Sequence, residues 1–407
     1  MGLNDTVSAE RLHISFFGRR NAGKSSLVNA VTGQSLSVVS PVKGTTTDPV
    51  QKAMELLPLG PVLIIDTPGY DDMGELGALR VEKTNEVLGK TDLAVLVYDA
   101  AAGMQAEDRK LLAQLKERKL PVILVANKAD LLSTAAAAAI SAGEGEDSPV
   151  LVSAATGEGI HALKERLADL GRRSEQPRFL LADLVSPGNT VILVIPVDES
   201  APKGRLILPQ QQTLRELLDL HCSGICCQVE EISAILNSLK SPPRLVVTDS
   251  QAFGRVSPLV PASIPLTSFS ILFARYKGQL STLVAGARAL SALKDGDRVL
   301  ISEGCTHHRQ CNDIGTVKLP GWVRSYTEKA LDFAFSSGGT FPENLGDYQL
   351  VIHCGGCMLN EAAMKHRMEL ARRAGVPMVN YGVAIANMHG ILRRSLEPFP
   401  EILRELD

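Results

Sequence analysis

A glycine-rich loop between an apolar strand and a helix is the feature that most constrains the fold of this chain. Residues 11–31, RLHISFFGRRNAGKSSLVNAV, fit the pattern G-x-x-x-x-G-K-[ST], with Gly18, Gly23, Lys24 and Ser25 at the fixed positions. Backbone N–H groups of such a loop wrap phosphates at a helix N-terminus, where the helix dipole favours negative charge. We therefore expect Lys24 to reach the β- and γ-phosphates and Ser25 to ligate Mg²⁺. The other loop residues expected to line the phosphates are Asn21, Ala22 and Ser26.

A second motif supplies the expected magnesium and γ-phosphate contacts. The apolar run PVLIIDTPGY ends at Asp66, which is suited to holding Mg²⁺, and at Gly69, which is suited to sensing the γ-phosphate. Between the two motifs, KGTTTDP offers switch threonines, of which Thr46 is the first choice for Mg²⁺ and Thr47 the second. We expect Lys24, Thr46, Asp66 and Gly69 to carry the hydrolysis of the nucleotide.

Two further strand ends indicate which base is bound. PVILVANKAD ends with Asn127, Lys128 and Asp130. A carboxylate at Asp130 can accept hydrogen bonds from the N1 and N2 groups of guanine, which adenine lacks, and such polar pairing discriminates strongly. SPVLVSAATGEG adds Ser153 and Ala154 as the loop that supports the base. Four motifs in this order, each at a strand end, resemble a translation-factor-like GTPase domain, and we predict GTP binding.

Details of these motifs bear on the rate of hydrolysis. Tyr70 follows DTPG, where Ras-like enzymes use a glutamine to orient water, so hydrolysis is expected to be slow or to use another device. Asn21 together with the GTTTD switch resembles potassium-activated GTPases such as the tRNA-modifying TrmE group. That resemblance implies K⁺ near the phosphates in place of an arginine finger, although Asn21 can also be a plain loop residue.

Composition limits the other functions open to the chain. Its 407 residues, 45% hydrophobic and 21% charged, suffice for two or three soluble domains. The net charge of −3 gives no basic footprint for nucleic acid. No apolar run reaches the roughly 18 residues of a membrane span, and the start lacks the form of a signal peptide. MGLNDT fits a short myristoylation pattern, but a cytoplasmic protein is the better interpretation.

The middle of the chain is short and follows a polar linker at residues 171–179. We expect domains over 1–173, 174–262 and 263–407, the second of them a small α/β domain. Its apolar core is small, so a partner or neighbouring segment is expected to complete it, most simply in a symmetric dimer. Segments SAPKGRLILPQ and VPMVNYGVAIA are interpreted as containing strands. The cysteines of HCSGICC follow no common metal spacing and are interpreted as small buried residues; they are Cys222, Cys226 and Cys227.

The last part of the chain places metal-ligating residues at two strand ends. GDRVLISEGCTHH and DYQLVIHCGGC alternate with helical patterns, which predicts a parallel α/β sheet with helices on both faces. Ligands gather beyond the carboxyl ends of such strands, so the two groups can converge. Three thiolates with one or two histidines suit either a structural zinc or an iron–sulfur cluster. The candidate ligands are Cys305, His307, His353, Cys354 and Cys357, with Cys311 as a spare or alternate.

A GTPase domain, a small middle domain and then C-x-H…H-C-x-x-C together resemble HydF, the maturation GTPase family of di-iron hydrogenases. APKGRLILPQ, TSFSILFAR, DIGTVKLP and HCGGCMLN are also similar to that family, so the resemblance spans essentially the whole chain. It implies a P-loop GTPase domain, a dimerisation domain, and a parallel-sheet domain in which Cys305, Cys354 and Cys357 hold a 4Fe-4S cluster. A histidine, His307 or His353, would be the fourth ligand.

The same resemblance implies the partners. The family assembles or carries a di-iron precursor and delivers it to apo FeFe-hydrogenase, while the radical-SAM maturases HydE and HydG supply the other ligands. GTP would then switch partner contacts, which is an argument by analogy. Two alternatives stay open: a translation- or tRNA-associated GTPase with a structural zinc, and a GTP-gated iron–sulfur redox carrier.

Overall fold

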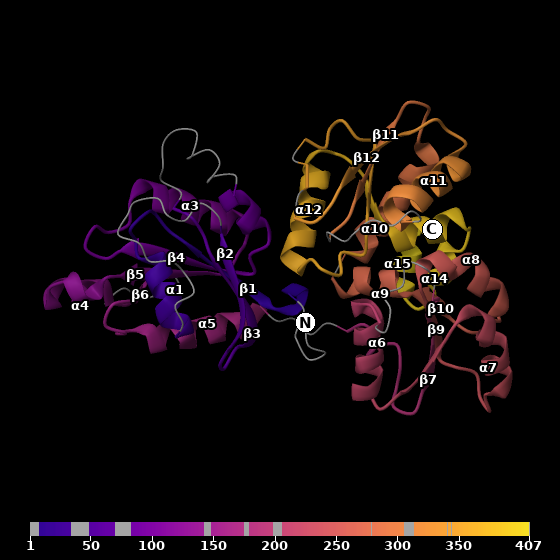
Figure 1. The fold of residues 1–407 in the computed structure, drawn as a ribbon, viewed down its shortest axis with the longest axis horizontal. Coiled ribbons are helices and arrows are strands. Elements are labelled where there is room, and N and C mark those ends of the chain that lie inside the picture. The colour runs from indigo at the N-terminus through magenta and orange to yellow at the C-terminus, as the bar shows by residue number, and fades with distance from the viewer. Residues whose placement is uncertain are drawn as a thin grey trace. The chain divides into compact units, whose positions relative to one another are not determined.

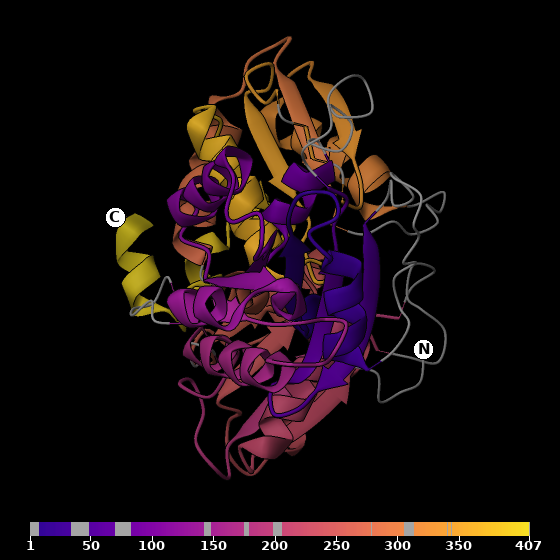
Figure 2. The same ribbon diagram turned by 90° about the vertical axis from the view of Figure 1, so that its left-hand side faces the viewer.

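The computed structural model describes most of the chain and divides it into two compact units. The described residues are 8–33, 49–69, 83–141, 148–174, 179–197, 206–277, 279–304, 313–339, 341–342 and 344–406. One unit comprises Met1–Gln176 with Asn360–Ala363, and the other comprises Pro177–Leu359 with Met364–Asp407. Figures 1 and 2 show both, the first in indigo to magenta. Within the described ranges, no helix has the length and apolarity that crossing a bilayer requires.

The first unit is built on one mixed sheet, in which six strands of its described part follow the order β2-β3-β1-β4-β5-β6. The pairing of β2 with β3 is antiparallel, and the other pairings are parallel. The strands are β1 (Leu12–Phe17), β2 (Val50–Leu56), β3 (Gly60–Asp66), β4 (Leu93–Asp99), β5 (Val122–Asn127) and β6 (Val150–Leu151). The helices include α1 (Lys24–Thr32), α3 (Ala106–Glu117), α4 (Thr134–Ser141) and α5 (Ile160–Ser174).

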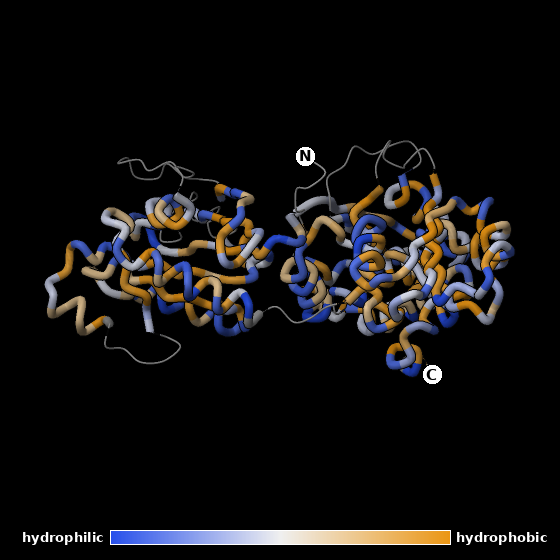
Figure 3. Tube along the Cα trace, turned by 90° about the horizontal axis from the view of Figure 1, so that it is seen from below, coloured by the Kyte–Doolittle hydropathy of each residue, from blue (hydrophilic) through white to orange (hydrophobic). Residues whose placement is uncertain are grey.

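The strands β1, β3 and β4 of this sheet are apolar on both faces because each face packs on its own core, whereas β2 is largely exposed. Ile14 and Phe16 of β1 belong to one core, which also contains Leu27 of α1. Phe17 belongs to the other, with Leu115 of α3. This confirms the prediction of an α/β unit in which apolar strands lead to polar motifs. Figure 3 shows the hydrophobic residues concentrated along these strands.

The second unit contains two four-stranded sheets among its described residues, and every pairing in them is parallel. The second sheet of the chain has the order β10-β9-β7-β8, and the third sheet has the order β12-β11-β13-β14. Their strands are β7 (Thr190–Val194), β8 (Ser223–Cys227), β9 (Leu245–Thr248), β10 (Leu266–Ser268), β11 (Arg298–Ser302), β12 (Asp332–Ser336), β13 (Leu350–His353) and β14 (Met378–Asn380).

The helices of this unit connect and cover those strands (Figure 1). They include α6 (Leu208–Asp219), α7 (Ile232–Ser238), α8 (Phe253–Val256), α9 (Phe269–Tyr276), α10 (Leu280–Ala287), α11 (Leu319–Thr327), α12 (Glu361–Arg373), α13 (Tyr381–Met388), α14 (Leu392–Ser395) and α15 (Pro400–Leu403). A single hydrophobic core runs from Leu180 to Phe399 and includes strands of both sheets. The small core expected in the middle of the chain is therefore completed by the neighbouring segment.

The two sheets of the second unit repeat one topology. In each, the first strand in the chain pairs with the second on one side and with the third on the other, and the fourth lies beyond the third. This order reverses direction between the first and third strands, and ligands of open parallel sheets bind at the carboxyl edge of that switch point. The switch points lie between β7 and β9 in one sheet and between β11 and β13 in the other.

The structure corrects two expectations and adds two strands. The strand expected in SAPKGRLILPQ is wrong for its described end, because Leu208 starts α6, Pro209 lies in its first turn, and the Gln210 side chain accepts a hydrogen bond from the Ile207 amide (3.0 Å). In VPMVNYGVAIA the strand stops at Asn380, whose side chain accepts a hydrogen bond from the Val383 amide (2.8 Å) and starts α13. Strand β10 was not expected; it pairs with β9 in the second sheet. Strand β12 was not expected at all.

Candidate functional site

The phosphate loop joins β1 to α1 and takes the conformation that its glycines permit. Gly23 is left-handed (φ 87°) and directly precedes α1. Lys24, the first residue of α1, is buried, and its Nζ donates hydrogen bonds to the carbonyl oxygens of Gly18 (2.7 Å) and Arg19 (2.9 Å). The ammonium group therefore lies against the loop that would surround the phosphates.

The base-recognition segment packs directly on the phosphate loop. Asn127, the last residue of β5, donates from Nδ2 to the Ala22 carbonyl (3.0 Å), and its Oδ1 accepts from the amide of Ala154 (3.1 Å). A Cβ at Gly23 would lie 2.2 Å from Asn127 Nδ2, so only glycine fits beside this side chain. One asparagine thus ties three of the sequence motifs together.

The two other base-recognition residues are also held in place. Ser153 Oγ donates to Asp130 Oδ1 (2.5 Å), which leaves the second carboxylate oxygen of Asp130 to face a base. Lys128 is left-handed (φ 67°), and its Nζ contacts Asp99 Oδ2 at 2.7 Å. Burial alone would raise the pKa of Asp99, but hydrogen bonds from Lys128 and from two backbone amides outweigh burial and lower the pKa.

The magnesium residues of the described chain lie together. Ser25 Oγ donates to Asp66 Oδ2 (2.7 Å), so the two expected Mg²⁺ contacts share one site. Gly69 lies against Arg20, because a Cβ there would be 2.9 Å from the Arg20 nitrogen. Asn21 is exposed and left-handed (φ 61°). Three residues of the expected switch lie outside the described residues, namely Thr46, Thr47 and Tyr70.

In the second unit, Cys354 lies at the switch point of the third sheet. It follows β13 directly, and its amide continues the ladder to the Ser302 carbonyl of β11 (2.9 Å). Its Sγ accepts hydrogen bonds from the amides of Gly304 (3.0 Å) and Gly356 (3.4 Å). Burial raises the pKa of the Cys354 thiol to about 11. The bond from Gly304 thus joins the end of the described segment after β11 to the turn after β13.

Cys357 lies beside a buried lysine that sequence reasoning missed. Lys277, at the end of α9, donates from Nζ to the carbonyl oxygens of Gly356 and Leu359, the latter at 2.9 Å. Burial raises the pKa of Cys357, and the positive charge of Lys277 opposes that rise. The lysine thus holds the C-x-x-C turn and places a positive charge near its thiols. A lone lysine after an apolar helix carries no sequence signal for this role.

Both ring nitrogens of His353 are already engaged. Nδ1 lies 2.7 Å from the Cys354 carbonyl oxygen, and Nε2 lies 2.8 Å from Nη1 of Arg367. A carbonyl only accepts and a guanidinium only donates, so Nδ1 carries the proton and Nε2 is the acceptor. His353 is completely buried, and burial together with Arg367 lowers its pKa to about 3. Arg367 also donates to the Gly338 carbonyl and lies over the Phe341 ring.

Only some of the other candidate metal ligands lie in the part of the chain that the structure describes. Cys305, His307 and Cys311 lie outside the described residues. Among the residues that are described, no three histidine, cysteine or acidic side chains cluster closely enough to hold a metal ion. Cys222 and Cys227 are buried, as expected, whereas Cys226 is exposed on β8.

Comparison with known proteins identifies family models that match three parts of the chain. The family model of the hydrogen maturase F dimerization domain matches residues 180–278, and that of the hydrogen maturase F tetramerization domain matches 281–398. A third model, described as 50S ribosome-binding GTPase, matches residues 13–128.

Curated relatives match over the GTPase domain. The tRNA modification GTPase MnmE of Prochlorococcus marinus (strain MIT 9303) is 34% identical over 43% of this chain and 38% of its own length. MnmE of Symbiobacterium thermophilum is 39% identical over 44% of this chain and 38% of its own length. The chain thus spans 38% of these relatives.

Solved structures resemble the chain only weakly. One is Era in complex with MgGDPNP and nucleotides of 16S ribosomal RNA, with 22% identity, a TM-score of 0.35, and coverage of 58% of this chain and 90% of that chain. Another is the bacterial selenocysteine-specific elongation factor EF-Sec, with 22% identity, a TM-score of 0.34, and coverage of 41% and 29%. At these scores the likenesses carry no argument about this chain.

Proposed function

Because this chain belongs to the hydrogen maturase F family and carries a GTPase domain, we propose that it is a GTP-hydrolysing scaffold for FeFe-hydrogenase maturation. It holds a 4Fe-4S cluster and delivers the di-iron precursor, its cargo, to apo FeFe-hydrogenase. The observation that carries the proposal is the hydrogen bond from Gly304 to Cys354 Sγ, because it joins the segment of Cys305 to the H-C-x-x-C turn.

The nucleotide is GTP with Mg²⁺. Ser25 and Asp66 are already in contact at 2.7 Å, which suits one small, oxygen-ligated cation, and Thr46 would complete its contacts. The Asp130 carboxylate, which accepts a hydrogen bond from Ser153, is the proposed acceptor for the N1 and N2 groups of guanine. Asn21, whose exposed side chain stands in the phosphate loop, is the proposed K⁺ contact. K⁺ then supplies the charge that an arginine finger supplies elsewhere, and hydrolysis in its absence is slow.

The donor set of the second unit fits a cluster with three thiolate ligands. Cys354 and Cys357 are soft ligands, and each is half-buried beside positive or N–H groups that favour a bound, deprotonated thiolate. Cys305 is the third ligand. When bound, the cluster supplies an iron with one exchangeable position. Lys277 and the amides of Gly304 and Gly356 orient the sulfurs and offset the negative charge of the site.

The exchangeable ligand is His307 rather than His353. For His353 to bind iron, Nε2 would have to leave Arg367 or Nδ1 would have to leave the Cys354 carbonyl. Either change would leave a buried polar group without its hydrogen-bond partner. His353 instead fixes the end of β13, from which Cys354 projects.

The partners follow from the same proposal. They are apo FeFe-hydrogenase, the maturases HydE and HydG, and further copies of this chain, because the matched domains are named for dimerization and tetramerization. GTP switches these contacts in the cytoplasm. The tRNA modification named for the MnmE relatives is not transferred, since those matches cover only the GTPase domain.

Metal analysis tests the cluster. After anaerobic purification, the protein should hold iron and sulfide in equal amounts and little zinc. Cys354→Ala should lose most of the iron, whereas Cys227→Ala, which changes a buried cysteine of the second sheet, should retain it. Stoichiometric zinc without sulfide would overturn the cluster and favour a structural zinc site.

Two further measurements test the ligand and the role. EPR of the reduced cluster should change in His307→Ala and stay unchanged in His353→Gln; the reverse pattern would reassign the ligand. Protein loaded by HydE and HydG should activate apo FeFe-hydrogenase, and an intact cluster without activation would leave a GTP-gated redox carrier instead.

A further inference from the structure

The third sheet has one covered edge and one open edge. At the covered edge, β14 is buried along its length, and α10 packs on it so closely that a Cβ at Gly286 would overlap the Met378 carbonyl oxygen. At the opposite edge, β12 is half-exposed, and no other strand in the described part of the chain pairs with its outer side. An open strand edge is a template on which another strand can pair.

The hydrogen bonds of β12 show which of its backbone groups face that open side. The Asp332 amide donates to a carbonyl oxygen just before β11 (3.0 Å), and the Ser336 carbonyl accepts from an amide just after β11 (2.9 Å). Both groups therefore face into the sheet. Because backbone groups alternate sides along a strand, the N–H and C=O groups of Phe333 and Phe335 face outward.

The side chains of β12 leave an aromatic ring at this edge. Phe333 and Phe335 lie on the same face of the sheet, because side chains alternate along a strand. The Arg324 guanidinium of α11 lies over the Phe333 ring, 4.9 Å from its centre, whereas Phe335 is 41% exposed. Natural edge strands often carry lysine or proline, which discourage pairing, and the sequence of β12, DFAFS, contains neither. This edge therefore favours pairing with another strand.

We propose that β12 is the edge through which the chain tetramerises, by antiparallel pairing with β12 of a second copy. A second copy is the occupant because the residues that match the hydrogen maturase F tetramerization model, 281–398, contain this whole sheet. A symmetric contact between two copies has a two-fold axis, which brings the like strands together antiparallel. The pairing needs neither GTP nor an iron–sulfur cluster, so it can be tested apart from the function proposed above.

The outward-facing groups fix the register of the pair. With the two-fold axis at Ala334, Phe333 of each copy lies opposite Phe335 of the other, and each such pair exchanges both N–H···O=C bonds. The exposed Phe335 ring then packs beside the Phe333 ring of the other copy. Asp332 lies opposite Ser336, so this register brings no like charges face to face.

Sedimentation of the full-length protein over a range of concentrations tests the contact. Wild type should show a dimer–tetramer equilibrium, and Phe335→Lys should raise the dissociation constant of the tetramer roughly a hundredfold, because each interface would bury two unpaired charges. Dimers should persist, since the dimerization model matches residues 180–278. Val317→Lys, at an exposed apolar residue of the same matched region but off the strand, should leave the equilibrium unchanged.

Disulfide formation tests the register. Ala334 is its own partner across the axis at a Cα–Cα distance of about 4.5 Å, so Ala334→Cys should give a covalent pair of chains on mild oxidation. Asp332→Cys is the matched control, because Asp332 is more exposed yet lies four positions out of register with its own copy. It should give no more covalent product than wild type. Equal crosslinking of the two variants would overturn the register.

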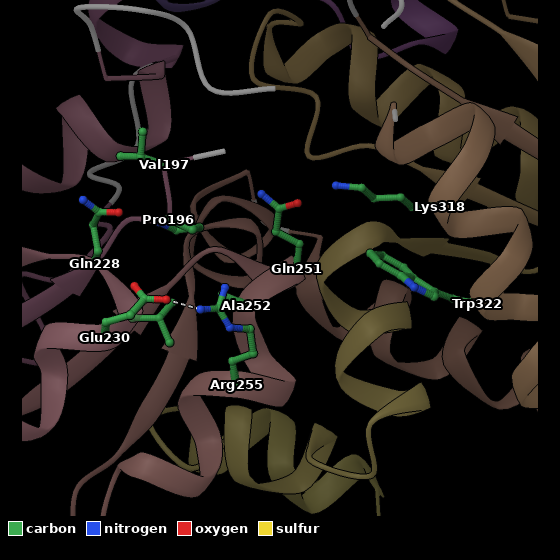
Figure 4. A pocket seen from close by; sticks show the side chains of 10 residues that line it. Pro196, Val197, Gln228, Glu230, Gln251, Ala252, Arg255, Lys318 and Trp322 are labelled. Carbon is green, nitrogen blue, oxygen red and sulfur yellow. Dashed lines mark hydrogen bonds and ion pairs between the residues drawn. The ribbon is translucent and has the colours of Figure 1, made fainter. Parts of the chain in front are cut away.

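The fold of each variant can be monitored through Trp322, the one tryptophan of the chain. Its side chain lines a cavity with residues that follow strands of the second sheet (Figure 4), and no described residue of β12 lines that cavity. Its emission should therefore stay as in wild type. Phe335→Pro, which removes an outward N–H and spares the bonds to β11, should also weaken the tetramer, by roughly tenfold.

Three results would overturn the proposal. Wild type could remain dimeric at every concentration, or Phe335→Lys and Phe335→Pro could both leave the tetramer unchanged. Loss of apo FeFe-hydrogenase binding in Phe335→Lys, with the tetramer intact, would assign this edge to that protein instead of a second copy.

Discussion

Arg367 Nη1 lies 2.8 Å from Nε2 of His353, and both side chains are buried. This pair fixes the tautomer of the histidine and joins α12 to the end of β13, from which the H-C-x-x-C turn departs. The pair thus acts as a structural support at the end of β13, beside the proposed cluster.

Replacement of Arg367 should therefore destabilise the second unit. Arg367→Met leaves His353 Nε2 and the Gly338 carbonyl without their donor in a buried site, and we expect a loss of about 3 kcal/mol in unfolding free energy. Arg373→Met on the same helix removes only an exposed ion pair with Glu369 and should change stability by less than about 0.5 kcal/mol. Urea denaturation of the apoprotein measures both, and equal effects would contradict the supporting role.

Two left-handed glycines flank α1 and offer a matched comparison. Gly23→Ala places a methyl group 2.2 Å from Asn127 Nδ2, so GTP affinity should fall roughly a hundredfold. Gly33→Ala meets nothing within 4 Å and should cost only the backbone strain of about 1–2 kcal/mol, with nucleotide affinity retained. Equilibrium binding of a fluorescent GDP analogue, with denaturation as the stability measure, distinguishes them. Equal affinity in both variants would show that the contact with Asn127 does not matter.

Potassium should accelerate GTP hydrolysis relative to sodium, by roughly tenfold, if Asn21 helps to hold the ion near the phosphates. Asn21→Gly removes the side chain and keeps the left-handed conformation (φ 61°) accessible, so the loop itself should be preserved. Phosphate release in KCl and in NaCl at equal ionic strength measures the effect. The same K⁺-to-Na⁺ ratio in wild type and variant, or no K⁺ effect at all, would remove this role.

The pair of Lys128 and Asp99 should make stability depend on pH. The pKa of Asp99 is lower in the folded protein than its ordinary value, so the carboxylate stabilises the fold above that value, and the contribution is lost as pH falls through the folded pKa. The difference in unfolding free energy between wild type and Lys128→Met should therefore be present at pH 7, at less than about 1 kcal/mol, and shrink below about pH 4. NMR titration of the Asp99 carboxyl group should show its midpoint rising in the variant. A pH-independent difference would indicate a packing effect.

The sequence motifs predicted the strand ends and the phosphate loop of the GTPase domain well, because each motif is a short segment at a strand end. Lys24, Asn127 and Asp130 lie where the glycine, strand and helix signals place them. Parallel strands bring such segments to one edge, so the local pattern is enough to assemble the site.

The buried residues that hold the H-C-x-x-C turn could not be predicted in the same way. Arg367 lies on a helix after His353, and Lys277 lies far upstream of the C-x-x-C turn, so their contacts depend on tertiary packing. The repeated topology was also hidden, because β12 is only half-buried and carries a weak strand pattern, and β10 is three residues long. The hydrogen bonds of His353 to Arg367 and to the Cys354 carbonyl also carried no sequence signal.

The repeated strand order has a practical consequence for engineering. Both sheets of the second unit contribute to one hydrophobic interior, while the loops that follow their strands emerge at separate strand ends. Segments at the ends of β7, β8 and β9 can therefore be redesigned, for example to graft a foreign metal-ligating turn, without altering the turn that follows β13. The second unit therefore offers two sets of strand-end loops, each open to redesign, on one shared hydrophobic core.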